Sequence, residues 1–313
     1  MNIKEVMQKA ESVKKNIEKV LVGKSAEIDL VLTAMLAMGH VLLEDVPGTG
    51  KTTLAKSLAA SISGTFKRIQ FTPDLLPTDL TGLNVYNPKT GDFNFKPGGL
   101  FTHILLADEI NRATPRTQSG LLECMEERQI TMDGETYKLS PPYFVIATQN
   151  PIETQGTFPL PEAQLDRFLM QLSIGYPDDE GAIITRFIHN NPLETLEPVA
   201  STDDFTLMQQ AAAAVRVHAD LCSYIAELAK ETRRHGAVSL GVSPRGSIAL
   251  AKSAQGYAAV KGRDFVIPED IKNLAPFVWA HRLSLRGVGQ NTSKDKVISD
   301  VLAKVPVPTE DMW

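Results

Sequence analysis

Residues 45–53 read Asp-Val-Pro-Gly-Thr-Gly-Lys-Thr-Thr, a glycine-rich stretch that ends in a lysine and hydroxyl side chains. Backbone N–H groups of such a turn can surround a phosphate chain, a lysine can reach the outer phosphates, and a threonine hydroxyl can bind Mg²⁺. We therefore expect this loop to bind a nucleoside triphosphate, with Lys51 also acting in catalysis. The expected binding residues are Pro47, Gly48, Thr49, Gly50, Lys51, Thr52 and Thr53.

The loop departs from the usual pattern G-x-x-x-x-G-K-[ST] at its first position, where Asp45 replaces glycine. Aspartate tolerates turn geometry better than most residues do. Asp45 can therefore hold the turn, provided that its carboxylate points away from the phosphates. The alternative is a glycine-rich turn that binds nothing. It is disfavoured because an apolar run precedes the loop and a helical pattern follows it.

A second group of polar residues follows buried apolar runs further along the chain. Asp108 and Glu109 come directly after the run Ile104–Ala107, and Asn150 follows a later run of the same kind. At the end of a strand, Asp108 can hold Mg²⁺, directly or through a water molecule, together with Thr52, and Glu109 can act as general base on the attacking water. The Asn150 amide can orient the same water, although Asn-Pro is also an ordinary turn signal. An acidic pair on a solvated surface is the alternative, but it does not explain the position after a phosphate loop.

Two arginines are further candidates for catalysis. Arg167 ends a short helix in the stretch LPEAQLDRF, and Arg245 lies in the first turn of a helix that begins at Ser243-Pro244. A cation near the start of a helix is unfavourable for the helix dipole, which suggests that Arg245 has a task there. An exposed arginine costs little at that position, so an idle side chain is the alternative.

The apolar pattern predicts the elements that position these residues. Helices are expected over 3–21, 26–38 and 52–61, and another begins at Thr114-Pro115. Strands are expected over 40–44, 67–71, 104–107, 143–147 and 169–174. Because strands alternate with helices, we expect a mostly parallel sheet that helices cover on both faces.

The pattern changes after Tyr176-Pro177. Helical segments are expected over 206–217, 219–234, 244–260 and 268–274, and no strand is expected there. We therefore divide the chain into an α/β domain, residues 1–177, and an α-helical domain, residues 178–313.

Composition limits the class of protein. The net charge is −5 and the pI is about 5.7, so the chain lacks the basic surplus of a dedicated DNA-binding protein, and no nucleic acid is expected. Its two cysteines, Cys124 and Cys222, form neither a disulfide framework nor a zinc site. The N-terminus is too charged for a signal peptide, and the longest uncharged apolar run, Leu30–Leu43, is too short to span a membrane. We expect a soluble cytoplasmic protein without membrane insertion.

Several longer stretches resemble one family. The phosphate loop, the strand end ILLADE, ATQNP, LPEAQLDRF and SPRG occur in this order in AAA+ ATPases. More narrowly, LLEDVPGTGKT, DEINRATPRTQSGLLECMEERQIT, ATQNPIETQGTFPLPEAQLDRF and GVSPRG resemble the MoxR family, in which Asp45 at the first loop position is common. The implied fold is a P-loop NTPase AAA+ core, with a five-stranded mostly parallel sheet between helices, followed by an all-α lid domain. The resemblance covers about residues 22–283.

The resemblance also implies that ATP and Mg²⁺ bind between the subunits of a homo-oligomer, usually a hexameric ring. Asp108 and Glu109 would be the Walker B pair, Asp108 and Thr52 the metal ligands, and Asn150 the first sensor. The segment Val22-Gly23 would pack near adenine, although a glycine that merely ends a helix is a nearly equal alternative.

The two arginines receive their roles from the resemblance as well. Arg167 would be the arginine finger that acts on the neighbouring subunit's ATP, and Arg112 and Arg116 are nearby competitors for that role. Arg245 would be the second sensor, which lies on the helical lid and reaches the γ-phosphate.

Two segments resemble the hairpin insertions of this branch, which face the pore of the ring or its client. They are DLTGLNVYNPKTGDFNFKPGGL and RQITMDGETYKLSPP, the second with a hairpin signal at Asp133-Gly134. Phe93 and Phe95 alternate with polar residues in the first segment. Packing of both aromatic rings on the core is the simpler expectation.

The favoured function is a Mg²⁺-dependent ATPase that drives chaperone-like remodelling or assembly of partner proteins. The resemblance implies that such partners often carry a von Willebrand factor A domain. One alternative is a nucleotide-switched binding module with little turnover, against which the intact Asp108-Glu109 pair weighs. The other is a DNA-acting AAA+ motor, against which the acidic balance weighs.

Overall fold

The computed structural model describes residues 1–150, 156–177, 179–286 and 292–308. Its centre is a five-stranded sheet in the order β2-β5-β8-β1-β9, in which all neighbouring strands run parallel. The strands are β1 (Val41–Glu44), β2 (Phe66–Gln70), β5 (Ile104–Asp108), β8 (Phe144–Gln149) and β9 (Met170–Leu172). The five predicted strands are therefore confirmed.

Helices cover both faces of this sheet. They are α1 (Ile3–Glu18), α2 (Ser25–Leu36), α3 (Lys51–Ser61), α4 (Pro77–Thr81), α5 (Pro115–Glu127) and α6 (Glu162–Leu165). In β5, Ile104 and Leu106 pack in the hydrophobic cluster that includes α1, α2 and α3, whereas Leu105 and Ala107 pack in the cluster that includes α5. Side chains of a strand alternate between the faces of a sheet, so an unbroken apolar run is what a strand buried on both faces requires.

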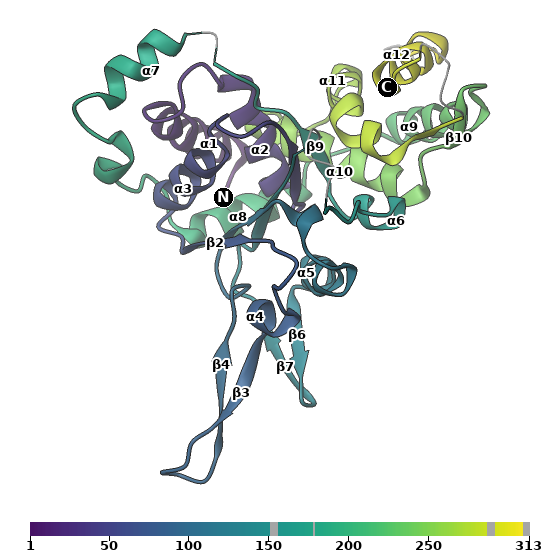
Figure 1. The fold of residues 1–313 in the computed structure, drawn as a ribbon. Helices are drawn as coiled ribbons and strands as arrows, with labels where there is room; N and C mark the ends of the chain where they lie inside the picture. Colours follow the sequence, from purple (N-terminus) through teal and green to yellow (C-terminus); the bar gives the residue numbers. More distant parts are fainter. Residues whose placement is uncertain (151–155, 178, 287–291, 309–313) are drawn as a thin grey trace.

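The second half of the chain is mainly helical, as expected, and Figure 1 shows α9 to α12 grouped on one side of the sheet. Its helices are α7 (Glu180–Phe187), α8 (Thr202–Ala213), α9 (Ala219–Arg234), α10 (Pro244–Val260), α11 (Pro268–Trp279) and α12 (Lys294–Lys304). Short 3-10 turns lie at η1 (Ile110–Arg112), η2 (Pro192–Thr195) and η3 (Ala280–Arg282). The bounds of α9 and α10 agree with the prediction, while α7 and α12 were not predicted.

The helical half shares a hydrophobic core with the first half. Phe205 of α8, Leu250 of α10 and Leu32 of α2 belong to one buried cluster. A Cβ at Gly256 would lie 2.7 Å from the carbonyl oxygen of Thr33, so glycine at this position lets α10 approach α2 closely. The division of the chain at residue 177 stays a prediction, and the core is continuous across that point.

The expectation of no strand after residue 177 is wrong. Strands β10 (Val238–Leu240) and β11 (Ser284–Leu285) form a small antiparallel sheet. The Ser239 hydroxyl and the Arg286 Nε both donate hydrogen bonds across it, to the carbonyl oxygens of Ser284 and Val238. Strands of two and three residues are too short to show a period, and this pair forms because folding brings distant segments together.

Both predicted hairpins are present and project together from the sheet, as Figure 1 shows. One consists of β3 (Gly82–Tyr86) and β4 (Phe93–Pro97), the other of β6 (Gln129–Met132) and β7 (Glu135–Lys138). Asp133 and Gly134 both have positive φ, 51° and 85°, as the predicted two-residue turn requires.

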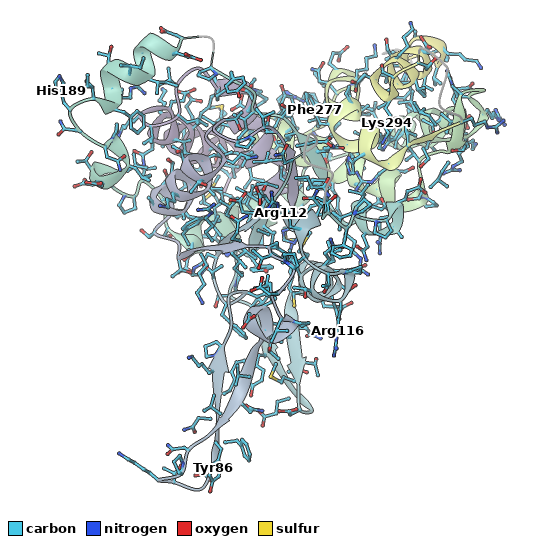
Figure 2. All side chains as sticks on the ribbon, viewed as in Figure 1. Tyr86, Arg112, Arg116, His189, Phe277 and Lys294 are labelled. Atoms are coloured by element: carbon cyan, nitrogen blue, oxygen red, sulfur yellow. The ribbon has the colours of Figure 1, made fainter. Side chains whose placement is uncertain are left out.

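The aromatic residues of the hairpins have different surroundings. Phe95 stacks on Tyr137 of the other hairpin, with ring centroids 4.1 Å apart, and also contacts Phe101. Phe93 is 68% exposed and contacts Tyr86, which Figure 2 shows near the tip of the first hairpin. The expectation of packing on the core is therefore wrong for Phe93, which is exposed near the tip. Phe95 is half-buried between the two hairpins and belongs to neither core cluster.

Candidate functional site

The glycine-rich loop joins β1 to the N-terminus of α3. Gly48 and Gly50 have φ values of 89° and 90°, which side chains other than glycine rarely adopt. Lys51 is the first residue of α3, and its Nζ donates a hydrogen bond of 2.9 Å to the carbonyl oxygen of Asp45. The loop thus presents backbone N–H groups and a helix N-terminus, an arrangement that suits an anion.

The side chain of Asp45 points away from the loop, as it must if aspartate is to hold the turn without repelling the phosphates. It is 4% exposed and accepts hydrogen bonds from the Ser173 hydroxyl (2.7 Å) and from the backbone N–H groups of Ile174 (2.7 Å) and Gly175 (3.0 Å). These residues follow β9. The aspartate that replaces glycine therefore has a structural partner elsewhere in the chain.

The acidic pair lies at the carboxyl end of β5. Asp108 accepts a hydrogen bond of 2.6 Å from the Thr148 hydroxyl and forms an ion pair of 2.7 Å with Arg68. Glu109 has a positive φ of 55°, which costs energy in a residue other than glycine and is often found at functional sites. Its backbone N–H donates to Thr148 Oγ1, so the same threonine fixes both acids.

The Glu109 carboxylate is held by two neighbours. Gln70 Nε2 lies 2.7 Å from Glu109 Oε2, and Arg112 Nε lies 3.0 Å from the same oxygen. Gln70 and Arg68 both come from β2, whose residue 70 pairs with residue 108 of β5. Neither residue was predicted from the sequence. Arg68 and Gln70 are two residues apart, so both side chains lie on one face of β2, but this is informative only when β2 is known to neighbour β5.

The phosphate loop and the acids face one cavity of about 390 Å³, the phosphate cavity. Its lining residues are Pro47, Gly48, Gly50, Lys51, Thr52, Thr53, Arg68, Gln70, Asp108, Glu109 and Asn150. The structure thus brings together five predicted catalytic and metal-binding residues from three separate segments.

The donors in the phosphate cavity fit a Mg²⁺ ion bound to a triphosphate. The Thr52 hydroxyl and the Asp108 carboxylate supply oxygen atoms, the ligands that Mg²⁺ prefers. Among the described residues, no cluster of three or more His, Cys, Asp or Glu side chains is suited to a metal. Mg²⁺ typically binds through one or two protein groups plus substrate phosphates, so a protein cage is not needed.

A smaller cavity of about 210 Å³, the base pocket, adjoins the loop and shares Gly48, Gly50 and Thr53 with the phosphate cavity. Its other lining residues are Val20, Leu21, Val22, Lys24, Thr49, Pro177, Ile183 and Phe187. Val22 lines this cavity together with loop residues, and its expected position near adenine stays a prediction. Gly23, with a φ of 72°, is not among the lining residues. Ile183 and Phe187 were not predicted to line a site, and both come from the unpredicted helix α7.

The two candidate arginines lie together elsewhere. Arg167 and Arg245 both pair with Glu126 of α5, at 3.5 and 2.5 Å. They line a cavity of about 490 Å³, the arginine cavity, with the further cations Arg128, Lys252 and Arg282. Neither arginine is among the described residues that line the phosphate cavity. Sequence order alone gave no indication that Glu126 joins them.

A buried ion pair fixes the backbone next to Arg167. Arg282 Nε lies 2.6 Å from the Asp166 carboxylate, and its other nitrogens donate to the carbonyl oxygens of Asp166, Phe168 and Leu169. Burial lowers the pKa of the Arg282 guanidinium, and Asp166 opposes that shift. Arg282 belongs to η3, so the helical half directly holds the segment that carries Arg167.

The two competitors for the finger role have different surroundings. Arg112 is half-buried and pairs with Glu109 of the same chain. Arg116 is exposed on α5, and Figure 2 shows it on the outer side of the molecule.

Comparisons with known proteins agree with this architecture. Residues 40–170 match the family model "ATPase family associated with various cellular activities (AAA)", and residues 230–301 match the model "AAA lid domain". The chain is 36% identical to a Cytophaga hutchinsonii protein of known crystal structure, provisionally described as an ATPase. The TM-score is 0.89, and the match covers 97% of this chain and 96% of the other.

Curated relatives match over almost the whole chain. The uncharacterized protein YeaC of Bacillus subtilis is 50% identical, over 94% of this chain and 93% of its own. The chaperone MoxR1 of Mycobacterium tuberculosis is 40% identical, over 93% of this chain and 80% of its own. The protein MoxR of Methylorubrum extorquens is 31% identical, over 93% of this chain and 92% of its own.

Proposed function

This chain belongs to the MoxR family of AAA+ ATPases, and we propose that it hydrolyses ATP with Mg²⁺ at the phosphate cavity and uses the cycle to remodel or assemble partner proteins. One observation carries the proposal: Lys51, Asp108 and Glu109 line one cavity beside a helix N-terminus. The name of the Mycobacterium tuberculosis relative, a chaperone, supports the remodelling part.

Each residue has a chemical task in this reaction. Lys51 binds the outer phosphates, and Thr52 and Asp108 hold Mg²⁺, which neutralises charge on the phosphate oxygens. Glu109 accepts a proton from the attacking water, and Asn150 orients that water. Arg68 pairs with the Asp108 oxygen that does not accept from Thr148, so a metal that bound that oxygen directly would compete with Arg68.

The two arginines of the arginine cavity complete the site of a neighbouring subunit in this proposal. Arg167 and Arg245 share Glu126 and do not line their own subunit's phosphate cavity. Two cations held side by side on a single carboxylate can transfer to the γ-phosphate of an adjacent copy. AAA+ ATPases commonly form rings, and we propose a hexameric ring with ATP between subunits.

The chemistry is tested by measuring the rate of ATP hydrolysis per subunit at increasing protein concentration, with Mg²⁺ and without a partner protein. The size of the assembly is measured in the same samples. A rate that climbs with ring formation is the expected result. Glu109→Gln should remove hydrolysis and leave ATP binding, and Lys51→Ala should remove both. Unchanged hydrolysis in Glu109→Gln would overturn the assignment of the base.

A nucleotide-switched binding module with little turnover is the second candidate. The contacts of Glu109 favour this candidate. Gln70 and Arg112 both bind the Glu109 carboxylate, so that carboxylate is less available to accept a proton from a water molecule. Nucleotide binding without hydrolysis in fully assembled rings would favour this candidate.

The partner proteins are tested separately from the chemistry. We propose proteins with a von Willebrand factor A domain as clients, because the family resemblance implies them. The experiment follows the protease sensitivity of such a domain with ATP, with ADP and with the Glu109→Gln variant. A change that requires both ATP and an intact Glu109 supports remodelling, and identical digestion under all conditions contradicts it.

A further inference from the structure

The segment 173–177, which we call the strap, connects β9 to the region of α7 and is held by the phosphate loop. Asp45, at the start of that loop, accepts all three hydrogen bonds described above from Ser173, Ile174 and Gly175. The carboxylate is nearly inaccessible, so water cannot replace it as acceptor for these donors. The strap is thus tied to the very turn that would bind the phosphates.

A second charged side chain holds the far end of the strap. Lys24 is buried, and its Nζ donates a hydrogen bond of 3.0 Å to the carbonyl oxygen of Tyr176. Lys24 also lines the base pocket. Both contacts therefore connect the strap to residues that surround the proposed nucleotide.

The strap leads to one side of the base pocket. Pro177, together with Ile183 and Phe187 of α7, supplies apolar lining, and Val20, Leu21 and Val22 supply the rest. An apolar cavity next to a phosphate loop suits the flat faces of a nucleobase. Recognition of the base then depends on where the strap and α7 are held.

Helix α7 has little support of its own. It has no buried residue, and Figure 1 shows it at the periphery of the molecule. Arg186 ties it to the end of α1 by donating to the carbonyl oxygens of Glu18 and Lys19, at 2.7 and 2.9 Å. With so few contacts, the position of α7 depends strongly on the strap that precedes it.

We propose that Asp45 is a positioning residue for recognition of the nucleobase: it anchors the strap and thereby places Pro177 and α7 against the base. The proposal rests on the proposed function, because it assumes that the phosphate loop binds a nucleoside triphosphate. It explains why an aspartate occupies a loop position where glycine is usual. Glycine would allow the turn but would leave the strap donors without an acceptor.

The test compares two ligands, ATP and inorganic tripolyphosphate, which has the phosphates but no base. Binding of both, with Mg²⁺, is measured by calorimetry for the wild type and for Asp45→Asn. The asparagine side chain has one acceptor oxygen where aspartate has two. Its NH₂ group would also face the N–H and O–H donors of the strap, which it cannot accept from. We expect ATP affinity to fall about tenfold, the effect of one lost buried hydrogen bond, while tripolyphosphate affinity does not fall.

Two control variants separate positioning from general damage. Asp29→Asn alters another buried carboxylate, which pairs with Lys14 and Lys261 and lines none of the three cavities described above. It should destabilise the fold without changing the ratio of the two affinities. Lys51→Ala should weaken both ligands, because it acts on the phosphates.

A second pair of variants keeps the test decisive if Asp45→Asn does not fold. Phe187→Ala removes part of the pocket wall and should weaken ATP only. Ile184→Ala, on the same helix but 62% exposed and outside the pocket lining, should change neither ligand.

The outcomes are distinct. Equal loss of both ligands in Asp45→Asn would mean that Asp45 shapes the loop itself, and no loss of either would mean that the strap is not needed; each overturns the proposal. If the wild type binds neither ligand, the proposed function fails first and the positioning role falls with it.

Discussion

Asp166 and Arg282 form an ion pair at the junction of the two halves of the chain, with Arg282 Nε 2.6 Å from Asp166 Oδ1. The Arg282 side chain is only 3% exposed, and its remaining nitrogens bind backbone carbonyl oxygens of the same segment. Arg167 is the next residue after Asp166. A shift of the helical half would therefore be transmitted directly to the backbone of the proposed finger.

The first prediction concerns this ion pair. Arg282→Gln should lower the free energy of unfolding by about 3–5 kcal/mol, because it leaves the Asp166 carboxylate largely buried without a counter-ion. Urea denaturation measures the loss. Arg216→Gln is the control, since the Arg216–Asp264 pair is well exposed and should change stability by less than about 1 kcal/mol. Similar losses in both variants would contradict a special role for the buried pair.

The second prediction concerns the arginine cavity. Arg167→Ala and Arg245→Ala should each lower hydrolysis in assembled rings, Arg167→Ala by about 10³-fold, and leave ATP binding nearly intact. Binding is preserved because neither side chain lines its own phosphate cavity. A mixture of Arg167→Ala and Lys51→Ala subunits provides the sharper measurement. Neither variant alone can place an intact Arg167 beside a neighbour's intact Lys51, whereas a ring that contains both variants can. Loss of ATP binding in Arg167→Ala alone would show a structural role.

The sequence predicted the parallel sheet most clearly at its three central strands, β1, β5 and β8, because these are buried on both faces and read as apolar runs. It also predicted that Lys51, Asp108 and Asn150 meet, since residues at the carboxyl ends of parallel strands lie at one edge of the sheet. Arg68 and Gln70 were missed because their contribution depends on the order of the strands. No local pattern carries that information.

The location of Arg245 was less predictable. The helix that bears it was predicted with the observed bounds, but its surroundings depend on how α10 packs against α2. That contact is made possible by Gly256, which the pattern did not single out. Helix α7 was also missed: it is a short helix of eight residues with no buried residue, and its apolar residues cover only two turns.

The third prediction concerns Glu126, the shared partner of Arg167 and Arg245. Glu126→Gln removes the charge that holds both arginines within their own subunit, so hydrolysis should begin at a lower protein concentration than in the wild type. The pairs are partly exposed, and stability should change by less than about 1 kcal/mol. Glu123→Gln on the same helix is exposed and is the matched control. If hydrolysis by Glu126→Gln instead began at a higher protein concentration than in the wild type, the carboxylate would serve to direct the two arginines toward the neighbouring subunit.

The last prediction is a pH dependence of stability that originates in buried histidines. Burial is the main reason that the pKa of His40 falls from 6.5 to about 3, and the charge of Arg128 adds to the shift. His40 Nδ1 accepts from the Val145 N–H and its Nε2 donates to the Met125 carbonyl oxygen, so the neutral ring satisfies both partners. Burial likewise places the pKa of His281 well below its usual value.

Stability falls with falling pH because His40 takes up a proton at a higher pH in the unfolded chain than in the folded chain. The unfolded chain takes up a proton on His40 as the pH falls through 6.5, whereas the folded chain does so only near 3. The stabilisation is therefore complete above pH 6.5 and is lost progressively between 6.5 and 3, at about 1.4 kcal/mol for each pH unit and each such histidine. Urea denaturation between about pH 7 and about pH 5 measures the slope, above the range in which the shifted carboxylates Asp204 and Asp300 titrate. His40→Gln should reduce the slope of unfolding free energy against pH by one proton, whereas His189→Gln, at an exposed position, should not. Equal slopes in the wild type and both variants would contradict the role of His40.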